Sequence, residues 1–141
     1  MNRQATLSVR APGAGLHEFT MEVARFVRES GCEQGLLTLF VRHTSCSLLV
    51  QENADPDVRA DLDEFFRRLV PRSDQPGMSW VRHGMEGPDD MPGHIKAALT
   101  ATSLSIPVAS GQLVLGRWQG IFLFEHRDRG QAREVVLHLS A

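Results

Sequence analysis

Three stretches of the chain place a histidine beside acids and amides, which are residue types that could do acid–base or metal chemistry. The first runs from Arg42-His43-Thr44-Ser45 to Glu52-Asn53-Ala54-Asp55, the second from Glu86 to His94, and the third from Trp118 to Arg127. An imidazole can exchange a proton near neutral pH and can also bind a metal ion. Such groups, recurring at the ends of expected strands and helices, are typical of one site built from distant parts of a fold. We therefore expect the three stretches to converge.

The first stretch offers a histidine and a possible anion site. His43 follows an apolar run, so its imidazole is expected at a strand end as a proton acceptor or metal ligand. Alternatively, it is a polar strand end that bonds to the neighbouring hydroxyls. Glu52 and Asn53 precede a helix whose free amides favour anions, so a substrate phosphate could bind there. In the simpler interpretation, Asp55 only caps that helix and Glu52 is a solvated charge.

The second stretch pairs an acid with a histidine. Asp90 and His94 are four residues apart at the start of a short helix, so their side chains can reach the same side of its first turn. This spacing suits a shared metal ion, or a carboxylate that orients an imidazole. The adjacent acids Asp89 and Asp90 would favour Mg²⁺ or a similar hard cation if other oxygen ligands joined them. Lys96 could bind a phosphate or simply be solvated.

The third stretch lies on expected sheet. Trp118 and Gln119 end one strand-like segment and residues 125–127 end the next, so a hairpin could bring them to one edge. Successive strand residues point to opposite faces, so Glu125 and Arg127 would share a face, as an ion pair, and His126 would take the other. All three can line a pocket only if the strand ends or bulges there.

The remaining histidines are interpreted as structural. His17 is expected on a helix surface, His83 in a mobile loop and His138 inside a strand. The chain contains no P-loop, dinucleotide-binding, H-E-x-x-H or G-x-S-x-G motif. With 141 residues it is also shorter than an ordinary (β/α)₈ barrel of about 250 residues.

Periodicity and turn signals predict an α+β fold. Strands are expected at 6–10, 36–41, 46–50, 104–108, 112–115, 120–124 and 134–139, with the C-terminal half forming an antiparallel sheet. Helices are expected from about 16 to 30, from the Asp55-Pro56 start to Pro71, and, shorter, from about 92 to 101. The segment 72–92 is rich in Pro, Gly, Asp and Ser and is too long for a simple connector, so it is expected to be functional or disordered.

Composition predicts one soluble globular domain spanning residues 1–141, because 42% of residues are hydrophobic and 23% charged. The net charge of -2 provides no basic face for nucleic acid. No apolar run is long enough to target or span a membrane. Cys32 and Cys46 are isolated thiols, expected as core residues in a reducing compartment, which indicates the cytoplasm.

Together the quoted blocks resemble the signature blocks of the YjbQ family, also called the secondary thiamine-phosphate synthase family. The resemblance covers residues 43–48, 52–58, 86–96, 116–121 and 125–127. Cys46 stands where Ala is usual and Arg117 where Thr is usual, and neither difference removes a candidate functional group. The resemblance implies a YjbQ-like α+β fold of packed, mostly antiparallel sheets with two longer helices and one short helix. It also implies a homotrimer and a polar cleft suited to a metal ion, and family members are linked to weak thiamine-phosphate synthase activity.

The leading hypothesis is therefore an enzyme that couples a hydroxymethylpyrimidine pyrophosphate to a thiazole phosphate. The expected catalytic residues are His43, Glu52, Asp90, His94 and His126. The expected substrate-binding residues are Ser45, Asn53, Lys96, Trp118, Gln119 and Arg127. A divalent metal ion, Mg²⁺ or Zn²⁺, would be bound by His43, His94 and His126. The alternatives are another metal-assisted enzyme, such as a hydrolase, and a non-enzymatic trimeric protein that binds a small phosphorylated metabolite.

Overall fold

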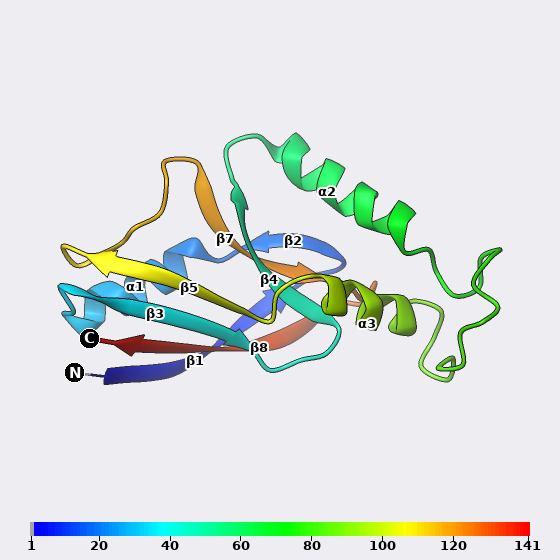
Figure 1. Cartoon of the computed structure of the whole chain (residues 1–141), viewed down its shortest axis with the longest axis horizontal. Helices are drawn as coiled ribbons and strands as arrows, with labels where there is room; N and C mark the ends of the chain where they lie inside the picture. The colour runs from blue at the N-terminus through cyan, green and yellow to red at the C-terminus, as the bar shows by residue number, and fades with distance from the viewer. Residues whose placement is uncertain (1) are drawn as a thin grey trace.

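Two antiparallel sheets form the body of the protein in the computed structural model, which describes residues 2–141 (Figure 1). The larger sheet has the order β1-β8-β3-β5-β6, and the smaller has the order β2-β7-β4. The larger sheet comprises β1 (Asn2–Ala11), β8 (Gln131–Ser140), β3 (Gln34–Val41), β5 (Ser103–Ala109) and β6 (Gln112–Leu113). The smaller comprises β2 (Gly15–Glu18), β7 (Gln119–Glu125) and β4 (Cys46–Glu52). The helices are α1 (Thr20–Ser30), α2 (Pro56–Leu69) and α3 (Asp90–Leu99), so the predicted α+β class is confirmed.

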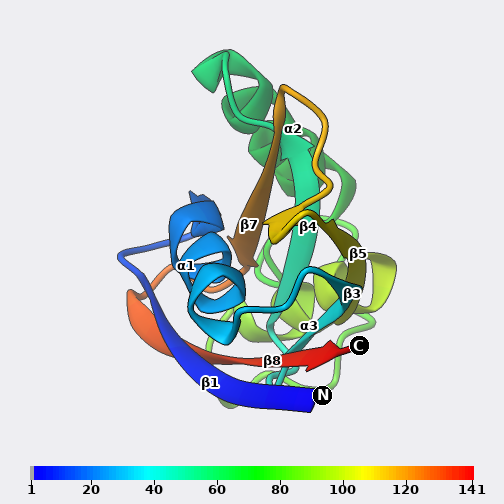
Figure 2. The ribbon, with the colours of Figure 1, turned by 90° about the vertical axis from the view of Figure 1, so that its left-hand side faces the viewer.

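The core lies between the inner faces of the two sheets and α1. Alternate residues of β8 are buried, among them Val135 and Leu137, as the two-residue period of a half-buried strand requires. Val23 and Val27, four residues apart, bury one face of α1, which lies within the curve of β1 and β8 (Figure 2). Both predicted core cysteines, Cys32 and Cys46, are buried free thiols in this cluster.

The first helix begins at Thr20, later than the helical spacing predicts. Residues 15–18 instead form β2, which pairs with β7 and places Leu16 opposite Phe124. Gly15 has a φ of +121°, a conformation that favours glycine, and it allows the chain to turn into this short strand. His17 consequently lies on a strand, with its Nε2 2.7 Å from the backbone oxygen of Gly13, and not on a helix surface.

The C-terminal strands pair antiparallel, as the sequence predicted, but they are divided between the two sheets. β8 lies between β1 and β3 in the larger sheet, whereas β7 pairs with β2 and β4 in the smaller one. The partners of β8 come from the N-terminal third of the chain. The sheet to which a strand belongs thus depends on long-range pairing, which local periodicity does not encode.

The two remaining helices lie over and beside the smaller sheet. The Oδ1 of Asp55 accepts a hydrogen bond of 2.9 Å from the backbone of Asp57, which confirms the predicted cap of α2. The helix contacts the sheet through Phe66, whose ring centroid is 5.3 Å from that of Phe124. The third helix begins at Asp90, two residues before the expected Pro92, because a proline is tolerated in the first turn, where amides have no helical partner. No helix within residues 2–141 is long and apolar enough to cross a membrane.

Candidate metal centre

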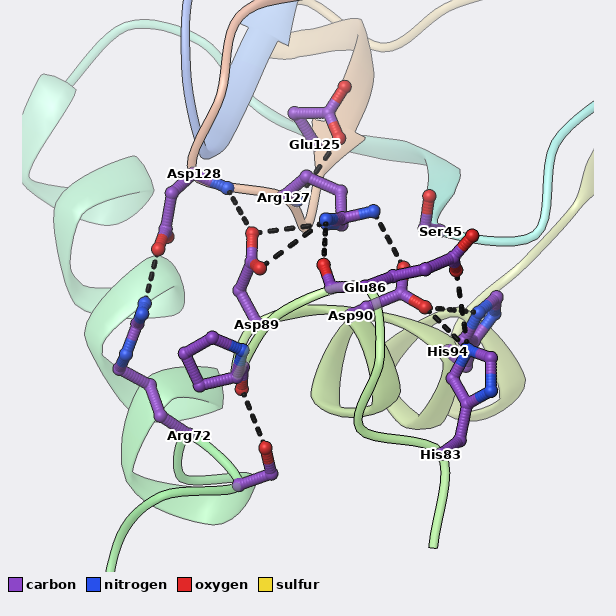
Figure 3. Close-up of polar contacts among 12 residues, drawn as sticks. Ser45, Arg72, His83, Glu86, Asp89, Asp90, His94, Glu125, Arg127 and Asp128 are labelled. Carbon is purple, nitrogen blue, oxygen red and sulfur yellow. Dashed lines mark hydrogen bonds and ion pairs between the residues drawn. The ribbon is translucent and has the colours of Figure 1, made fainter. Parts of the chain in front are cut away.

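Four side chains gather where the loop before α3 returns to the first turns of that helix (Figure 3). The loop supplies His83 and Glu86, and the helix supplies Asp90 and His94. The Oδ2 of Asp90 is 2.7 Å from the Nε2 of His83 and 3.2 Å from the Nε2 of His94. The Oε2 of Glu86 is 3.3 Å from the Nε2 of His83. Two imidazoles and two carboxylates therefore present ligand atoms that all lie within 4.8 Å of one another.

The charge at the centre of this cluster is buried. Asp90 is 2% exposed. Burial alone would raise the pKa of its carboxyl, but the hydrogen bonds with Glu86 and His83 and the charge of Arg127 lower it below its usual range. The hydrogen bond to Asp90 in turn raises the pKa of His83. An ionised, buried carboxylate needs cations beside it. Arg127 supplies one at Oδ1, and a protonated His83 or a metal ion can supply another at Oδ2.

Hydrogen bonds around the cluster fix the direction of its ligands. The Nδ1 of His94 lies 2.9 Å from the backbone oxygen of Thr44, to which it can only donate, so Nε2, on the side of Asp90, is the nitrogen that would bind a metal ion. Arg127 donates from Nη1 to the Oδ1 of Asp90 at 2.6 Å and from Nε to Asp89 at 3.0 Å. Its Nη2 donates to the backbone oxygen of Glu86 at 3.0 Å. Such outer hydrogen bonds to a histidine and a carboxylate are typical of metal sites.

A buried ion pair supports the loop that contacts His94. The Nε of Arg133 donates to the Oε1 of Glu125 at 2.7 Å, and both side chains are buried. The Nη2 of Arg133 also donates to the hydroxyl of Ser45 at 2.9 Å and to its backbone oxygen at 3.2 Å. The expected ion pair between Glu125 and Arg127 is therefore wrong. β7 ends at Glu125, so strand alternation does not extend to Arg127, and Arg127 contacts that carboxylate only through its backbone amide.

His43 and His126 lie outside the four-residue cluster. The Nε2 of His43 accepts a hydrogen bond of 2.8 Å from the backbone of Glu134, and burial together with the charge of Arg133 lowers the pKa of its imidazole. His126 is 3% exposed, its Nε2 is 2.9 Å from the hydroxyl of Ser47, and burial lowers its pKa to about 3. Of the three histidines expected to bind metal, His94 belongs to the cluster, whereas His43 and His126 do not.

The polar residues at the other end of β4 and β7 form a separate group. The register pairs Cys46 with Glu125 at one end and Glu52 with Gln119 at the other. Six residues of antiparallel strand span about 20 Å, so within one chain these residues lie far from the cluster. Here Glu52 accepts a hydrogen bond from the backbone of Asp55, Asn53 donates to Glu18, and Trp118 is 55% exposed. The three stretches therefore converge only in part within this chain.

Sequence reasoning missed two members of the cluster. It interpreted His83 as structural and did not select Glu86, although it expected the segment around them to be functional or disordered. The spacing His83-x-x-Glu86-x-x-x-Asp90-x-x-x-His94 is the signal that could have identified them. The buried Arg133 was also missed, and its signal is a charge in the row of alternating core positions of β8.

Comparisons with known proteins match almost the whole chain. The model of the family described as "UPF0047 protein YjbQ-like" matches residues 5–141. A UPF0047 protein of Synechocystis is 51% identical over 137 residues, which cover 97% of this chain and 90% of that protein. YjbQ of Escherichia coli O157:H7 is 42% identical, with 96% of each chain covered. A crystal structure of a YjbQ/UPF0047 family protein from Clostridium acetobutylicum is similar with a TM-score of 0.80 at 30% identity, covering 98% of this chain and 99% of that one.

Proposed function

This chain belongs to the YjbQ-like UPF0047 family, and we propose that it is a metal-dependent enzyme that acts on a small phosphorylated metabolite. The observation that carries the proposal is the cluster of His83, Glu86, Asp90 and His94, whose ligand atoms all lie within 4.8 Å of one another. Ligands around a tetrahedral Zn²⁺ are about 3.4 Å apart, given metal–ligand distances near 2.0–2.2 Å. A small inward movement of these side chains would therefore suffice for binding.

The types of ligand favour a transition metal. Imidazole nitrogens suit Zn²⁺, Cu²⁺, Fe²⁺ or Ni²⁺, whereas Mg²⁺ prefers oxygen ligands and keeps several waters. With two histidines among its four members, the cluster is better suited to Zn²⁺ than to Mg²⁺. The rotation of His94 is already set by Thr44 and that of Asp90 by Arg127, so little reorganisation of these two ligands is required.

Two reactions suit such a centre. In the coupling that the family resemblance implies, the ring nitrogen of a thiazole phosphate forms a C–N bond to the pyrimidine methylene while the C–O bond to pyrophosphate breaks. A cation on the departing pyrophosphate would stabilise its developing charge. In the hydrolytic alternative, a water would attack phosphorus while the P–O bond to the leaving group breaks, and a metal ion held by the cluster would lower the pKa of that water. The distance of Trp118 from the cluster favours hydrolysis within one chain, since the coupling also needs a surface for the pyrimidine ring.

The second polar group can take part if it comes from another subunit. We propose the homotrimer that the family resemblance implies, in which Glu52, Asn53 and Trp118 of one chain complete the site of its neighbour. Light scattering would test the trimer. Mixing an inactive Glu52→Gln variant with an inactive Asp90→Asn variant would test the shared site, because only mixed trimers would regain activity. Equal inactivity of the mixture and its parents would contradict it.

An assay of the purified protein, with and without metal, tests the proposed function. We expect about one Zn²⁺ per chain and metal-dependent release of pyrophosphate or phosphate from a pyrimidine pyrophosphate. Dependence of that release on thiazole phosphate would identify the coupling reaction, and independence would identify hydrolysis. Asp90→Asn should abolish metal binding and turnover, whereas His138→Gln, a histidine on β8, should preserve both. Full turnover in chelator-treated protein would refute a metal-dependent enzyme, and ligand binding without turnover would indicate the non-enzymatic alternative.

We propose a cytoplasmic location, which the two free thiols suit.

A further inference from the structure

A small pocket lies on the side of α3 that faces away from the metal cluster. It is enclosed by α2, the start of α3 and the residues around the end of β7, and its volume is about 70 Å³. Lys96 and His126 both line it. Lys96 follows His94 by two residues, which places it about 200° around the helix axis from that ligand. The helix therefore separates two polar sites.

Lys96 is the single lysine of the protein. The sequence has 15 basic residues, and the other 14 are arginines. Arginine cannot lose its proton in a protein, whereas lysine offers a compact ammonium on a flexible stem whose pKa shifts readily on burial. Burial lowers the pKa of Lys96, as do the charges of Arg67 and Arg72, against opposing effects of Asp63 and Asp128. A lone, half-buried lysine in a chain that otherwise uses arginine is a reason to look for a ligand.

The other charges around the pocket already have partners. Arg67 binds Asp63 with an Nε–Oδ2 distance of 2.9 Å, and Arg72 binds Asp128. Asp89 is held by Arg127, and Glu125 is held by Arg133. Within residues 2–141, Lys96 is the cation of the pocket that forms no ion pair. Its charge is therefore available to an anion.

His126 supplies a second unsatisfied group. The residue is only 3% exposed, and its buried Nδ1 has no hydrogen-bond partner within the described residues. If Nε2 accepts a hydrogen bond from the hydroxyl of Ser47, Nδ1 carries the proton and is a free donor. A buried donor without a partner destabilises the folded protein, and a bound acceptor would remove this cost. An anion that reaches this nitrogen must displace part of the pocket wall, and the flexible Lys96 side chain can move.

We propose that this pocket binds a phosphoryl-sized oxyanion, held by the Lys96 ammonium and the Nδ1–H of His126. The small volume of the pocket, about 70 Å³, limits the ligand to one such group. The proposal deepens the proposed function, on which it rests for the identity of the ligand as part of a phosphorylated substrate. The occupancy of the pocket by free phosphate is independent of the metal site.

The single lysine allows a direct test by NMR. In protein labelled with ¹³C and ¹⁵N lysine, the side-chain signals come from Lys96 alone. We expect inorganic phosphate, added to metal-free protein, to move these signals with saturation. The ¹⁵N signal of His126 should show a protonated Nδ1 that shifts in the same titration. Lys96 signals that do not move with phosphate would overturn the proposal without any need for a variant.

Two variants separate this pocket from the metal centre. Lys96→Met keeps the length of the side chain but removes its charge, and we expect at least a tenfold loss of phosphate affinity with unchanged Zn²⁺ binding. Arg129→Met removes the same charge from an exposed residue outside the pocket and should leave phosphate affinity unchanged. Equal phosphate affinity in both variants would refute the pocket even if the metal centre is confirmed. Absence of metal binding with intact phosphate binding would refute only the metal centre.

Discussion

The imidazole of His94 is oriented by the backbone of Thr44, with 2.9 Å between Nδ1 and the carbonyl oxygen. A carbonyl oxygen only accepts hydrogen bonds, so Nδ1 must carry the proton. The other nitrogen, Nε2, lies 3.2 Å from the Oδ2 of Asp90 and is the one that would bind a metal ion. The position of this nitrogen is thus set by a loop fifty residues earlier in the chain.

The first prediction concerns the tautomer of His94. We expect ¹⁵N spectra to show that Nδ1 is protonated both with and without metal, and addition of Zn²⁺ to shift the Nε2 signal while Nδ1 stays protonated. The histidine His138, whose Nδ1 is 2.8 Å from the side-chain oxygen of Gln4, serves as an internal control that should not respond. A Zn²⁺ shift at Nδ1 of His94 would contradict the role given to Thr44.

The second prediction concerns Arg127, which holds Asp90 in place. Removal of this guanidinium leaves two nearby carboxylates without their partner, so we expect Arg127→Ala to lower the free energy of unfolding by about 2–3 kcal/mol. The expected value is below that of a fully buried pair because the Arg127 side chain is 24% exposed. Zn²⁺ affinity should also fall by roughly 10- to 100-fold, as for other outer hydrogen bonds. Denaturant titration and calorimetry would measure the two effects.

Two further variants separate the guanidinium contacts of Arg127 from the effect of its charge alone and from the effect of truncating any arginine nearby. Arg127→Lys should recover little, because an ammonium cannot bond to Asp89, Asp90 and the backbone of Glu86 at once. Arg129→Ala, two residues on and exposed, should change the free energy of unfolding by less than about 0.5 kcal/mol. Equal effects at positions 127 and 129 would mean that the guanidinium contacts do not stabilise the cluster.

Local patterns predicted one half of the candidate metal centre. Asp90 and His94 could be placed side by side because helical geometry brings residues four apart onto one face. His83 could not, because the path of the loop before α3 is set by contacts such as those of Glu86 and Asp90 and has no period. The expected convergence of all three stretches was only partly right for the same reason. The register of β4 and β7 is a long-range property, and it places Glu52 and Glu125 at opposite ends.

The third prediction is a loss of stability in mild acid that comes from His126. In the unfolded chain this imidazole takes up a proton near its ordinary pKa of 6.5, whereas in the folded protein burial lowers the pKa to about 3. Between these values the unfolded state binds the extra proton, so the contribution of His126 to stability is complete above pH 6.5 and declines as the pH falls. The expected decline is about 1.4 kcal/mol per pH unit within this window.

Urea unfolding at several pH values between 7 and 4 would measure this decline. His126→Phe keeps a ring beside Phe124 but cannot take up a proton. The free energy of unfolding of this variant should therefore fall less steeply with decreasing pH, by about 1.4 kcal/mol per pH unit. The comparison uses the slope with pH, and a general loss of stability at neutral pH does not affect it. Parallel slopes for the variant and the unmodified protein would show that His126 is protonated in the folded state.

The fourth prediction separates the structural and functional roles of the buried pair of Glu125 and Arg133. Arg133→Met leaves a buried carboxylate without its cation and should cost about 3–5 kcal/mol. Adding Glu125→Leu removes that charge as well, and stability should return to near its original value. The double variant still lacks the hydrogen bonds from Arg133 to Ser45, which anchor the loop in which the preceding carbonyl, that of Thr44, orients His94. Its Zn²⁺ affinity should therefore stay at least tenfold lower although the fold is restored. If calorimetry instead finds full affinity in the stable double variant, the ion pair serves the core alone and the loop is held by its other contacts.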